Sequence, residues 1–385
     1  MIENIRKGEN KLDFSKFVFV DQWKMKVRIG DLTKIRTGKL DANAASMDGQ
    51  YPFFTCSKEP LRISTYSYDC ECVLVAGNGD LNVKYYNGKF DAYQRTYIIE
   101  NNNVEKLYLP YLYYFLETYI EELRKQAIGG VIKYIKICNL SDAVIELPSI
   151  EKQKKIVKIL KSSKKCLDMR NTQMAFLDGL IKARFVELFG DPRSNPYGFG
   201  KKLLRDTCKV VTGNTPSRSV EAYYGDYVEW IKTDNIVSGL LNPTKATESL
   251  SEEGMKVGRT VEKGSILMAC IAGSIASIGR VCVTDRRVAF NQQISAIVPE
   301  EYNILFLYVL LQLSKEYLVE EINMALKGIL SKSKLEEKEF IVPPMELQEQ
   351  FADFVHQVDK SKVVVQKALD EAQILFDSLM QKYFG

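Results

Sequence analysis

The sequence contains an internal repeat, and this repeat constrains the fold more than any other feature. Pro148–Gln153 and Pro343–Gln348 share the pattern P-x-x-E-x-Q at an offset of 195 residues. A loose pattern can recur by chance, but several anchors in one order favour duplication of a domain of roughly 120 to 140 residues followed by a helix. At the same offset, Leu112-Tyr113 matches Leu307-Tyr308. At an offset of 175, Asp31 matches Asp206 and Thr37-Gly38 matches Thr212-Gly213.

Each P-x-x-E-x-Q motif is followed by apolar residues at alternating three- and four-residue spacing. Seven of ten positions fit in the first stretch and nine of ten in the second, with Ser163, Arg170, Arg184 and Lys362 as polar interruptions. This spacing is typical of a coiled-coil seam, and a helix over the first stretch is about 50 Å long, which suits a spacer. The apolar positions are Ile156, Leu160, Leu167, Met174, Leu177, Ile181 and Leu188, then Phe351, Val355, Val358, Val365, Leu369, Ala372, Phe376, Leu379 and Tyr383.

The two helical stretches carry opposite net charge. Residues 149–190 sum to +6 and residues 344–385 to −3. Opposite charge favours pairing of the two helices with each other, and antiparallel pairing would place the two domains at opposite ends. Two alternatives remain open: each helix packs only on its own domain, or the same seam serves a partner protein.

Mixed α/β structure is the expected fold class for both domains. Short β-rich runs at 72–76, 96–100, 265–269 and 293–298 precede one strongly helical stretch in each copy. We expect a pseudo-twofold, circular arrangement of two similar α/β domains separated by two long antiparallel coiled-coil helices. The expected boundaries are an N-terminal segment 1–22 that completes the repeat, a first domain 23–148, a helix 149–189, a linker 190–200, a second domain 201–343 and a helix 344–385.

Composition excludes several classes of protein. The eight cysteines include no CxxC pair and the chain has one histidine, His356, so a zinc site or disulfide framework is not expected. The N-terminus lacks the apolar stretch of a signal peptide, and the longest apolar run, 304–311, is too short to span a bilayer, which predicts a cytoplasmic protein. A net charge of +4 permits nucleic-acid binding without indicating it.

Catalytic motifs are missing. No Walker A sequence or dinucleotide fingerprint occurs, and Asn195-Pro196-Tyr197-Gly198 lacks the second proline of an amino-methyltransferase motif. Glu336-Glu337-Lys338 resembles a nuclease E-x-K but lacks a suitable acidic partner upstream. We therefore expect a non-catalytic protein without metal or cofactor.

Polar loops in both domains carry side chains suited to DNA. Arg, Asn and Gln read base edges, whereas Lys, Ser and Thr contact phosphates, although solvated loops have the same composition. The candidates are Thr37, Lys39, Lys58, Lys84, Tyr85, Gln94 and Arg95 in the first domain, and Asn214, Thr215, Ser217, Arg218, Lys232, Asn235, Asn291, Gln292, Gln293 and Lys332 in the second.

Over nearly its whole length the chain resembles the specificity subunits of Type I restriction-modification systems. The resemblance rests on 145–160 and 340–355, where an apolar strand leads into P-x-x-E-x-Q and a heptad helix, and on the domain openings 29–32 and 204–206. Members more often have adjacent Glu and Gln, whereas Lys152 and Leu347 intervene here.

The resemblance implies two target-recognition domains that each read half of a split site in double-stranded DNA, with the paired helices setting the gap. It also implies partners: two methyltransferase subunits that hold S-adenosylmethionine and methylate adenine, and nuclease-translocase subunits. The competing interpretation is a duplicated scaffold that binds proteins and no DNA.

Overall fold

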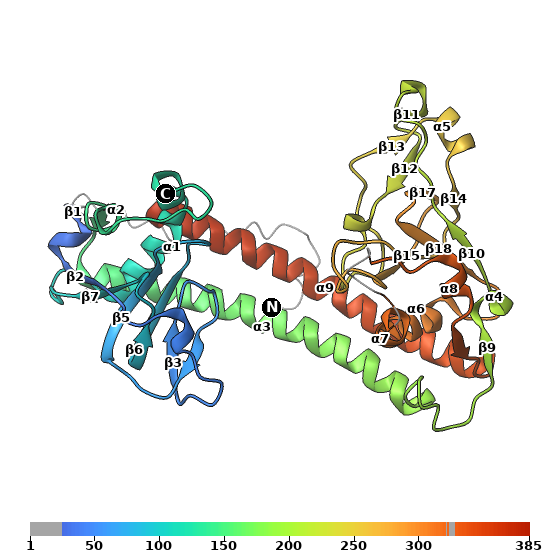
Figure 1. Cartoon of the computed structure of the whole chain (residues 1–385), viewed down its shortest axis with the longest axis horizontal. Helices are drawn as coiled ribbons and strands as arrows, with labels where there is room; N and C mark the ends of the chain where they lie inside the picture. Colours follow the sequence, from blue (N-terminus) through green and yellow to red (C-terminus); the bar gives the residue numbers. More distant parts are fainter. Residues whose placement is uncertain (1–24, 321, 323–327) are drawn as a thin grey trace, which may run out of the picture. The chain divides into compact units, whose positions relative to one another are not determined.

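The computed structural model describes residues 25–320, 322 and 328–385. They form two compact units, one of residues 25–168 with 370–385, the other of Met169–Leu369 (Figure 1). The segment 1–22, expected to complete the repeat, lies outside the described residues. In the described part of the chain, no helix is both long enough and apolar enough to cross a membrane.

The first unit is built on a mixed six-stranded sheet of order β2-β7-β5-β6-β3-β4, with a separate antiparallel pair β1-β8. Only β3 and β6 pair in parallel within the six-stranded sheet. Its elements are β1 (Met25–Arg28), η3 (Ile29–Asp31), β2 (Thr33–Thr37), η4 (Ala42–Ala44), β3 (Tyr51–Phe54), β4 (Leu61–Ile63), β5 (Tyr68–Ala76), β6 (Val83–Ala92), β7 (Thr96–Asn101), α1 (Leu109–Gln126), α2 (Ile137–Ser141) and β8 (Val144–Leu147).

The second unit holds a four-stranded sheet, β10-β18-β15-β16, a five-stranded sheet, β11-β13-β12-β17-β14, and the pair β19-β9. The mixed α/β class and the duplication are thereby confirmed. Its elements are β9 (Lys201–Leu203), α4 (Leu204–Thr207), β10 (Cys208–Thr212), η5 (Glu221–Tyr223), β11 (Tyr224–Gly225), β12 (Val228–Ile231), η6 (Thr233–Asn235), β13 (Ser249–Leu250), α5 (Glu252–Val257), β14 (Thr260–Val261), β15 (Ile266–Ala269), β16 (Val281–Val283), β17 (Val288–Phe290), β18 (Ile294–Pro299), α6 (Ile304–Leu313), α7 (Lys315–Val319), α8 (Lys332–Glu336) and β19 (Glu339–Ile341).

Central strands in both units are buried on both faces. In β5, Val73 and Val75 belong to the core formed with α1, whereas Cys72 and Leu74 pack in a second core on the opposite face. In β15, Ile266 and Met268 likewise share a core with α6, and Leu267 and Ala269 face the other sheet. Successive side chains of a strand point to opposite faces, so these unbroken apolar runs fit strands covered on both sides.

The extra residues of the second copy lie between β12 and β15. In the first unit, the segment 55–67 joins β3 to β5, whereas residues 232–265 join the corresponding strands β12 and β15. The longer connection contains η6, β13, α5 and β14. The change of offset from 175 to 195 in the sequence therefore reflects this insertion.

Two 40-residue helices follow the two domains: α3 (Ile150–Phe189) and α9 (Met345–Phe384). In the first unit, Ile156 and Leu160 of α3 lie in a core against which Phe376 and Leu379 of α9 pack. The start of one helix thus meets the end of the other, so the two segments run antiparallel within this unit.

The second unit contains the reciprocal pairing. The rings of Phe185 and Phe189 near the end of α3 lie 5.5 and 5.6 Å from that of Phe351 near the start of α9. Both α3 phenylalanines are fully buried, whereas the predicted seam position Leu188 is half-buried. The buried face is therefore displaced from the strict heptad positions towards the end of α3, as expected because 3.6 residues per turn drift against a 3.5-residue repeat.

The other predicted seam positions fall on the less exposed side of each helix. Their roles in helix pairing or partner binding stay a prediction. Ile156, Leu160, Leu167, Phe351, Val355, Val358 and Val365 are buried, and Met174, Leu177, Ile181, Leu369, Phe376 and Leu379 are half-buried.

Lys362, the polar interruption of the second heptad, is buried and paired. Its Nζ lies 2.8 Å from Asp178 Oδ1 on α3 and donates to the Gly239 carbonyl at 3.0 Å. A buried cation needs such partners, because desolvation of an unpaired charge costs several kcal/mol. The interruption is therefore a specific contact between the two helices and the second domain.

The P-x-x-E-x-Q glutamine of the first copy is a buried connector. Gln153 Oε1 accepts from the Tyr108 amide at 2.8 Å, and its Nε2 donates to the Lys106 carbonyl at 2.7 Å and the Pro148 carbonyl at 2.9 Å. These bonds join the first turn of α3 to the residues that precede α1.

The second copy repeats the connection. Gln348 Oε1 accepts from the Asn303 amide at 2.9 Å, and its Nε2 donates to the Pro343 carbonyl at 2.8 Å. The motif therefore fixes the start of each long helix against the preceding domain, which explains the requirement for an amide side chain.

Replacing Gln153 by alanine is expected to lower the stability of the first unit. The change leaves a buried amide and carbonyls without partners, which costs about 2–3 kcal/mol. Thermal unfolding followed by circular dichroism measures the effect. Gln173→Ala, at an exposed position of the same helix, is the matched control and should change stability by less than about 0.5 kcal/mol. Equal unfolding midpoints for the two variants would contradict a structural role for the buried amide.

Candidate nucleic-acid interface

The polar loops of the second unit meet at one edge of its sheets. β12 and β17 pair in parallel, with Ile231 opposite Phe290. The Asn291 amide then donates to the Ile231 carbonyl at 3.0 Å. Lys232 and Asn291, which directly follow the two strands, therefore lie at the same edge, because parallel strands end on the same side.

A third loop, 213–218, approaches this edge closely. The Gly213 amide donates to the Ile294 carbonyl at 2.9 Å, and a Cβ atom at Gly213 would lie 2.2 Å from the Asn291 carbonyl oxygen. Only glycine allows backbones to approach this closely. The Thr215 hydroxyl donates to Gln292 Oε1, so two exposed candidates from distant parts of the sequence are neighbours.

Arg218 and Lys232 converge on an acidic residue absent from the predicted set, Glu248. Arg218 Nη2 lies 2.7 Å from Glu248 Oε2, and Lys232 Nζ bonds to the other carboxylate oxygen. The Arg218 guanidinium also lies over the rings of Tyr224 and Trp230, at 4.5 and 5.0 Å. Hydrogen bonds from Lys232 and Arg218 hold the pKa of Glu248 below its ordinary value. The carboxylate therefore stays charged between the two cations.

Asn214 uses its side-chain amide inside the fold. Its Nδ2 donates to the Val257 carbonyl at 2.9 Å, and its Oδ1 accepts from the Arg259 amide at 2.8 Å. Its backbone carbonyl accepts from Trp230 Nε1 at 3.3 Å. This residue anchors the loop, and a direct contact to a base edge would have to break these bonds.

The other two candidate asparagines also bond internally. Asn235 Oδ1 caps η6 by accepting from the Lys232 amide at 3.0 Å, and its Nδ2 donates to Thr244 Oγ1 at 3.2 Å. Asn291 Oδ1 accepts from the Gln293 amide at 3.1 Å, and its Nδ2 donates to Gln293 Oε1 at 3.2 Å. Both asparagines are buried, so they shape the loops.

The remaining candidates of the second unit are more accessible. Thr215, Ser217, Arg218 and Gln292 are exposed. Lys332 is exposed at the start of α8, where its Nζ lies 3.5 Å from Glu336. The accessible polar side chains of the loop edge are therefore the exposed Thr215, Ser217, Arg218 and Gln292, together with the half-buried Lys232.

The first unit repeats the scaffold of this edge. β3 and β6 pair in parallel, and the Tyr93 amide donates to the Phe54 carbonyl at 2.9 Å. A Cβ atom at Gly38 would lie 2.2 Å from the Ala92 carbonyl oxygen, the same close approach as at Gly213. The exposed candidates here are Thr37, Lys39, Gln94 and Arg95.

Lys58, Lys84 and Tyr85 are held by other contacts in the first unit. Lys58 Nζ lies 3.9 Å from Asp80, and Lys84 bonds to Asn82 Oδ1, while burial lowers the Lys84 pKa. Tyr85, the next residue on β6, points to the opposite face. Its ring packs beside Tyr113 of α1, and its hydroxyl donates to Glu71 at 2.6 Å.

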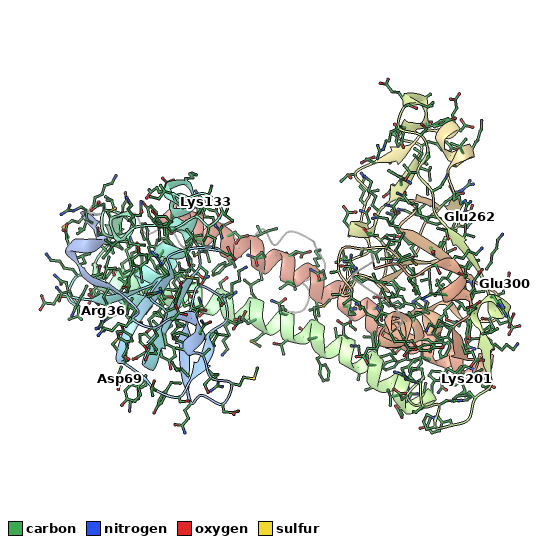
Figure 2. All side chains as sticks on the ribbon, in the orientation of Figure 1. Arg36, Asp69, Lys133, Lys201, Glu262 and Glu300 are labelled. Carbon is green, nitrogen blue, oxygen red and sulfur yellow. The ribbon has the colours of Figure 1, made fainter. Side chains whose placement is uncertain are left out.

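Sequence reasoning missed two further surface features. One is a cross-strand contact in which Arg36 Nη2 lies 2.7 Å from Glu100 and the guanidinium lies over the Tyr68 ring; Figure 2 labels Arg36. The other is a turn closed by pairing of Ile128 with Tyr134, where Val131 is fully exposed. The pair Gly129-Gly130 before Val131 is a turn signal that the sequence offers, whereas the ion pair has no local sequence signal.

The E-x-K sequence at 336–338 does not form a shared acidic site. Glu336 pairs with Lys332, whereas Lys338 Nζ lies 3.4 Å from Glu320 and 4.3 Å from the centre of the Tyr317 ring. Among the described residues, no three His, Cys, Asp or Glu side chains gather to hold a metal ion. Burial raises the pKa of the Cys270 thiol to about 11, which keeps it protonated at neutral pH.

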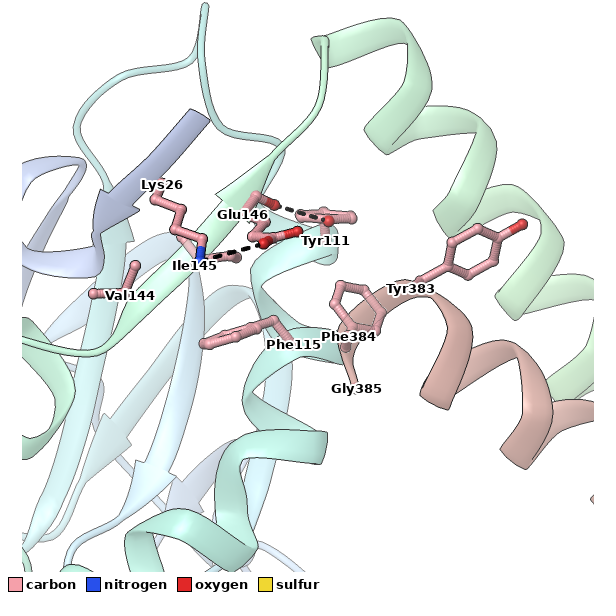
Figure 3. Close-up of a pocket in the computed structure, with 9 residues that line it drawn as sticks. All are labelled: Lys26, Tyr111, Phe115, Val144, Ile145, Glu146, Tyr383, Phe384 and Gly385. Carbon is pink, nitrogen blue, oxygen red and sulfur yellow. Dashed lines mark hydrogen bonds and ion pairs between the residues drawn. The ribbon is translucent and has the colours of Figure 1, made fainter. Parts of the chain in front are cut away.

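A pocket of about 270 Å³ lies in the first unit, between α1, β8 and the end of α9 (Figure 3). The Tyr111 hydroxyl donates to the Glu146 carbonyl at 3.1 Å, and Lys26 lies 3.8 Å from the Glu146 carboxylate. Phe115 and Phe384 line the apolar side. None of the candidate DNA-binding residues lines this pocket.

Two α/β domains, each with a buried glutamine connector and a similar loop edge, define a duplicated-domain protein. The family model described as the Type I restriction modification DNA specificity domain matches residues 21–175 and again residues 196–372. The chain belongs to this family.

Known relatives agree with this assignment. The chain is 44% identical over 131 residues to the EcoDI specificity subunit of Escherichia coli, a match that covers 34% of this chain and 29% of that protein. It is 25% identical over 309 residues to the MjaIX specificity subunit of Methanocaldococcus jannaschii, covering 74% of this chain and 69% of that one. The E. coli match therefore spans less than a third of that relative.

Two solved structures share the fold. The S subunit of a Type I system from M. genitalium superposes with a TM-score of 0.64 at 17% identity, over 96% of this chain and 98% of that chain. A chain from a study of Type I complex assembly and conformational transition gives a TM-score of 0.52 at 16% identity, over 95% and 99%. At these identities the likeness concerns the fold.

Asn214→Ala is expected to destabilise the second unit although Asn214 resembles a base-reading residue in sequence. Loss of its two side-chain hydrogen bonds should cost about 1–2 kcal/mol, measured by thermal unfolding. Ser217→Ala in the same loop is the control and should be nearly neutral. An unchanged midpoint combined with weakened DNA binding would instead assign Asn214 to base contact.

Proposed function

We propose that this chain is the DNA-recognition subunit of a Type I restriction-modification complex. The observation that carries the proposal is the loop edge, which recurs in both units on a similar scaffold but with different exposed side chains. The two halves of the chain also both match the specificity-domain family. Two domains with similar backbone scaffolds but different exposed side chains are suited to binding two different half-sites in DNA.

The proposed division of labour leaves chemistry to other subunits. The recognition domains, 23–148 and 201–343, bind the two halves of an asymmetric site in double-stranded DNA. Methyltransferase subunits, proposed as two, bind the helices and methylate adenine, and nuclease-translocase subunits add restriction. Membership of the family favours this function over a protein-interaction scaffold that does not bind DNA.

Within each domain, the exposed side chains of the loop edge are the proposed contacts. Arginine and glutamine present forked hydrogen-bonding groups to base edges, and lysine, serine and threonine suit phosphates. These residues are Thr37, Lys39, Gln94 and Arg95 in the first domain and Thr215, Ser217, Arg218, Lys232 and Gln292 in the second.

The proposed function predicts a two-part methylation motif. Cells that express this chain with the methyltransferase subunit that copurifies with it should show methylated adenines at two short sequences separated by a fixed, unread gap. Mapping of modified bases across the genome measures this. Cells with the methyltransferase subunit alone are the control, and a short continuous motif would contradict the proposal.

The length of α3 is proposed to set the gap. Deleting four residues within 164–176 removes about 6 Å of helix, close to two base pairs at ~3.4 Å each. The expected result is a changed gap or loss of assembly, with both half-sequences retained, as measured by mapping modified bases. Alanine at the exposed Asn171 and Gln173, which keeps the helix length, is the control. Altered half-sequences would contradict a spacer role.

A further inference from the structure

The Arg218, Lys232 and Glu248 cluster places one carboxylate between two cations of the proposed DNA-binding edge. Arg218 and Lys232 engage different oxygens of Glu248. The three side chains are partly exposed, with exposed fractions of 55% for Arg218, 29% for Lys232 and 34% for Glu248, although the Glu248 Oε2 atom is itself buried. Ion pairs between partly exposed side chains contribute little to stability, so fold stability alone is a weak reason for the arrangement.

Glu248 is fixed in position by the backbone around it. It directly precedes β13, and its carbonyl accepts from the Trp230 amide at 3.0 Å. Trp230 belongs to β12, the strand that leads into Lys232. The carboxylate and the lysine therefore come from paired segments of one sheet.

Arg218 is held by a second set of contacts. The loop that carries it is anchored by the Tyr224 hydroxyl, which donates to the Pro216 carbonyl at 2.7 Å, and by Trp230 Nε1 on the Asn214 carbonyl. The same two aromatic rings lie beneath the guanidinium. Stacking on Tyr224 and Trp230 restricts the guanidinium, while its Nη2 atom lies 2.7 Å from Glu248 Oε2.

We propose that Glu248 is a specificity-determining residue that suppresses binding to DNA lacking the recognition sequence. This inference rests on the proposed function. The carboxylate engages one nitrogen of Arg218 and the ammonium of Lys232 and repels phosphates, so non-specific phosphate contacts to these two cations must first displace it. A recognition sequence displaces it more readily, because a correctly registered site holds guanine O6 and N7 directly opposite the arginine fork. A phosphate also pairs with arginine bidentately, but in a non-specific complex no phosphate is held at that position.

Discrimination by a repulsive group is a general way to gain specificity, since specificity is a difference between two affinities. Glu248 lies in the segment between β12 and β15 that is longer in the second unit than in the first. The proposed restraint is thus a property of the second recognition domain.

Glu248→Gln in the full chain, purified with the methyltransferase subunit that copurifies with it, tests the proposal. Binding to a 30-base-pair duplex of unrelated sequence should tighten roughly 3- to 10-fold near physiological salt, and the salt slope should steepen by about one unit. Affinity for a duplex carrying the mapped motif should change less than about twofold, so the ratio of specific to non-specific affinity falls. Fluorescence anisotropy over a salt series measures all three quantities.

Glu301→Gln is the matched control, because it removes the same charge from an exposed pair with Lys202, 2.6 Å away. It should leave both affinities and the salt slope unchanged. Equal tightening by the two variants would indicate a bulk charge effect and overturn the proposal. Unchanged non-specific binding by Glu248→Gln would also overturn it.

Two further outcomes are distinguishable. Weaker binding to the motif, or a changed base in the mapped motif, would show that Glu248 itself reads a base, which overturns the restraining role but keeps the proposed function. Absence of salt-dependent DNA binding by the unmodified complex would instead overturn the proposed function, and this inference with it.

Discussion

The buried glutamine of the P-x-x-E-x-Q motif is the contact on which the arrangement of each unit depends. Gln153 and Gln348 each join the first turn of a long helix to the loop before the preceding domain helix, through a carbonyl oxygen that accepts and an amide that donates. A carboxylate could not donate, and an apolar side chain would leave the buried backbone groups unsatisfied. Each glutamine thereby helps to fix the direction in which its long helix leaves the domain, together with the apolar residues that the helix buries in the domain core.

The scaffold of the loop edge separates folding from recognition. In each unit a parallel strand pair ends beside a glycine, Gly38 or Gly213, that lets a third loop approach the backbone closely. The strand pairing and the close approach at glycine depend on the backbone and on buried residues. The exposed side chains of the loops can therefore differ between the units. The proposed DNA contacts are therefore made by loop side chains that a common fold carries.

The sequence supported prediction of the elements that have periodic or repeated signals. The repeat, the two long helices and the short β-rich runs follow from spacing and composition, and the structure confirms them. The displaced seam at Phe185 and Phe189 escaped a strict heptad count, because the drift of a helix against that repeat accumulates along its length. The insertion between β12 and β15 was visible only as a changed offset.

The candidate site was less accessible to sequence reasoning. Asn214, Asn235 and Asn291 have the composition of DNA-reading residues, yet their amides bond to the backbone and side chains of neighbouring segments. Conversely, Glu248 contacts Arg218 from 30 positions away, and nothing in the local pattern of either residue indicates it. Pairings between loops depend on sheet register, which the sequence of each loop alone does not encode.

The ion pair of Lys362 differs from the overall charge attraction between the two helices. The net charges of the helices favour their pairing, yet the ion pair in the second unit joins a lysine of the negative helix to an aspartate of the positive one. The same ammonium reaches the Gly239 carbonyl, in the segment that follows η6, and Arg280 donates to the Thr233 carbonyl within η6 at 3.3 Å. A buried polar contact has directional requirements that general charge attraction lacks, so the Lys362–Asp178 pair favours the register of the two helices in which its partners meet. Because its second acceptor belongs to the recognition domain, helix register and the position of the η6 loop are coupled in the second unit.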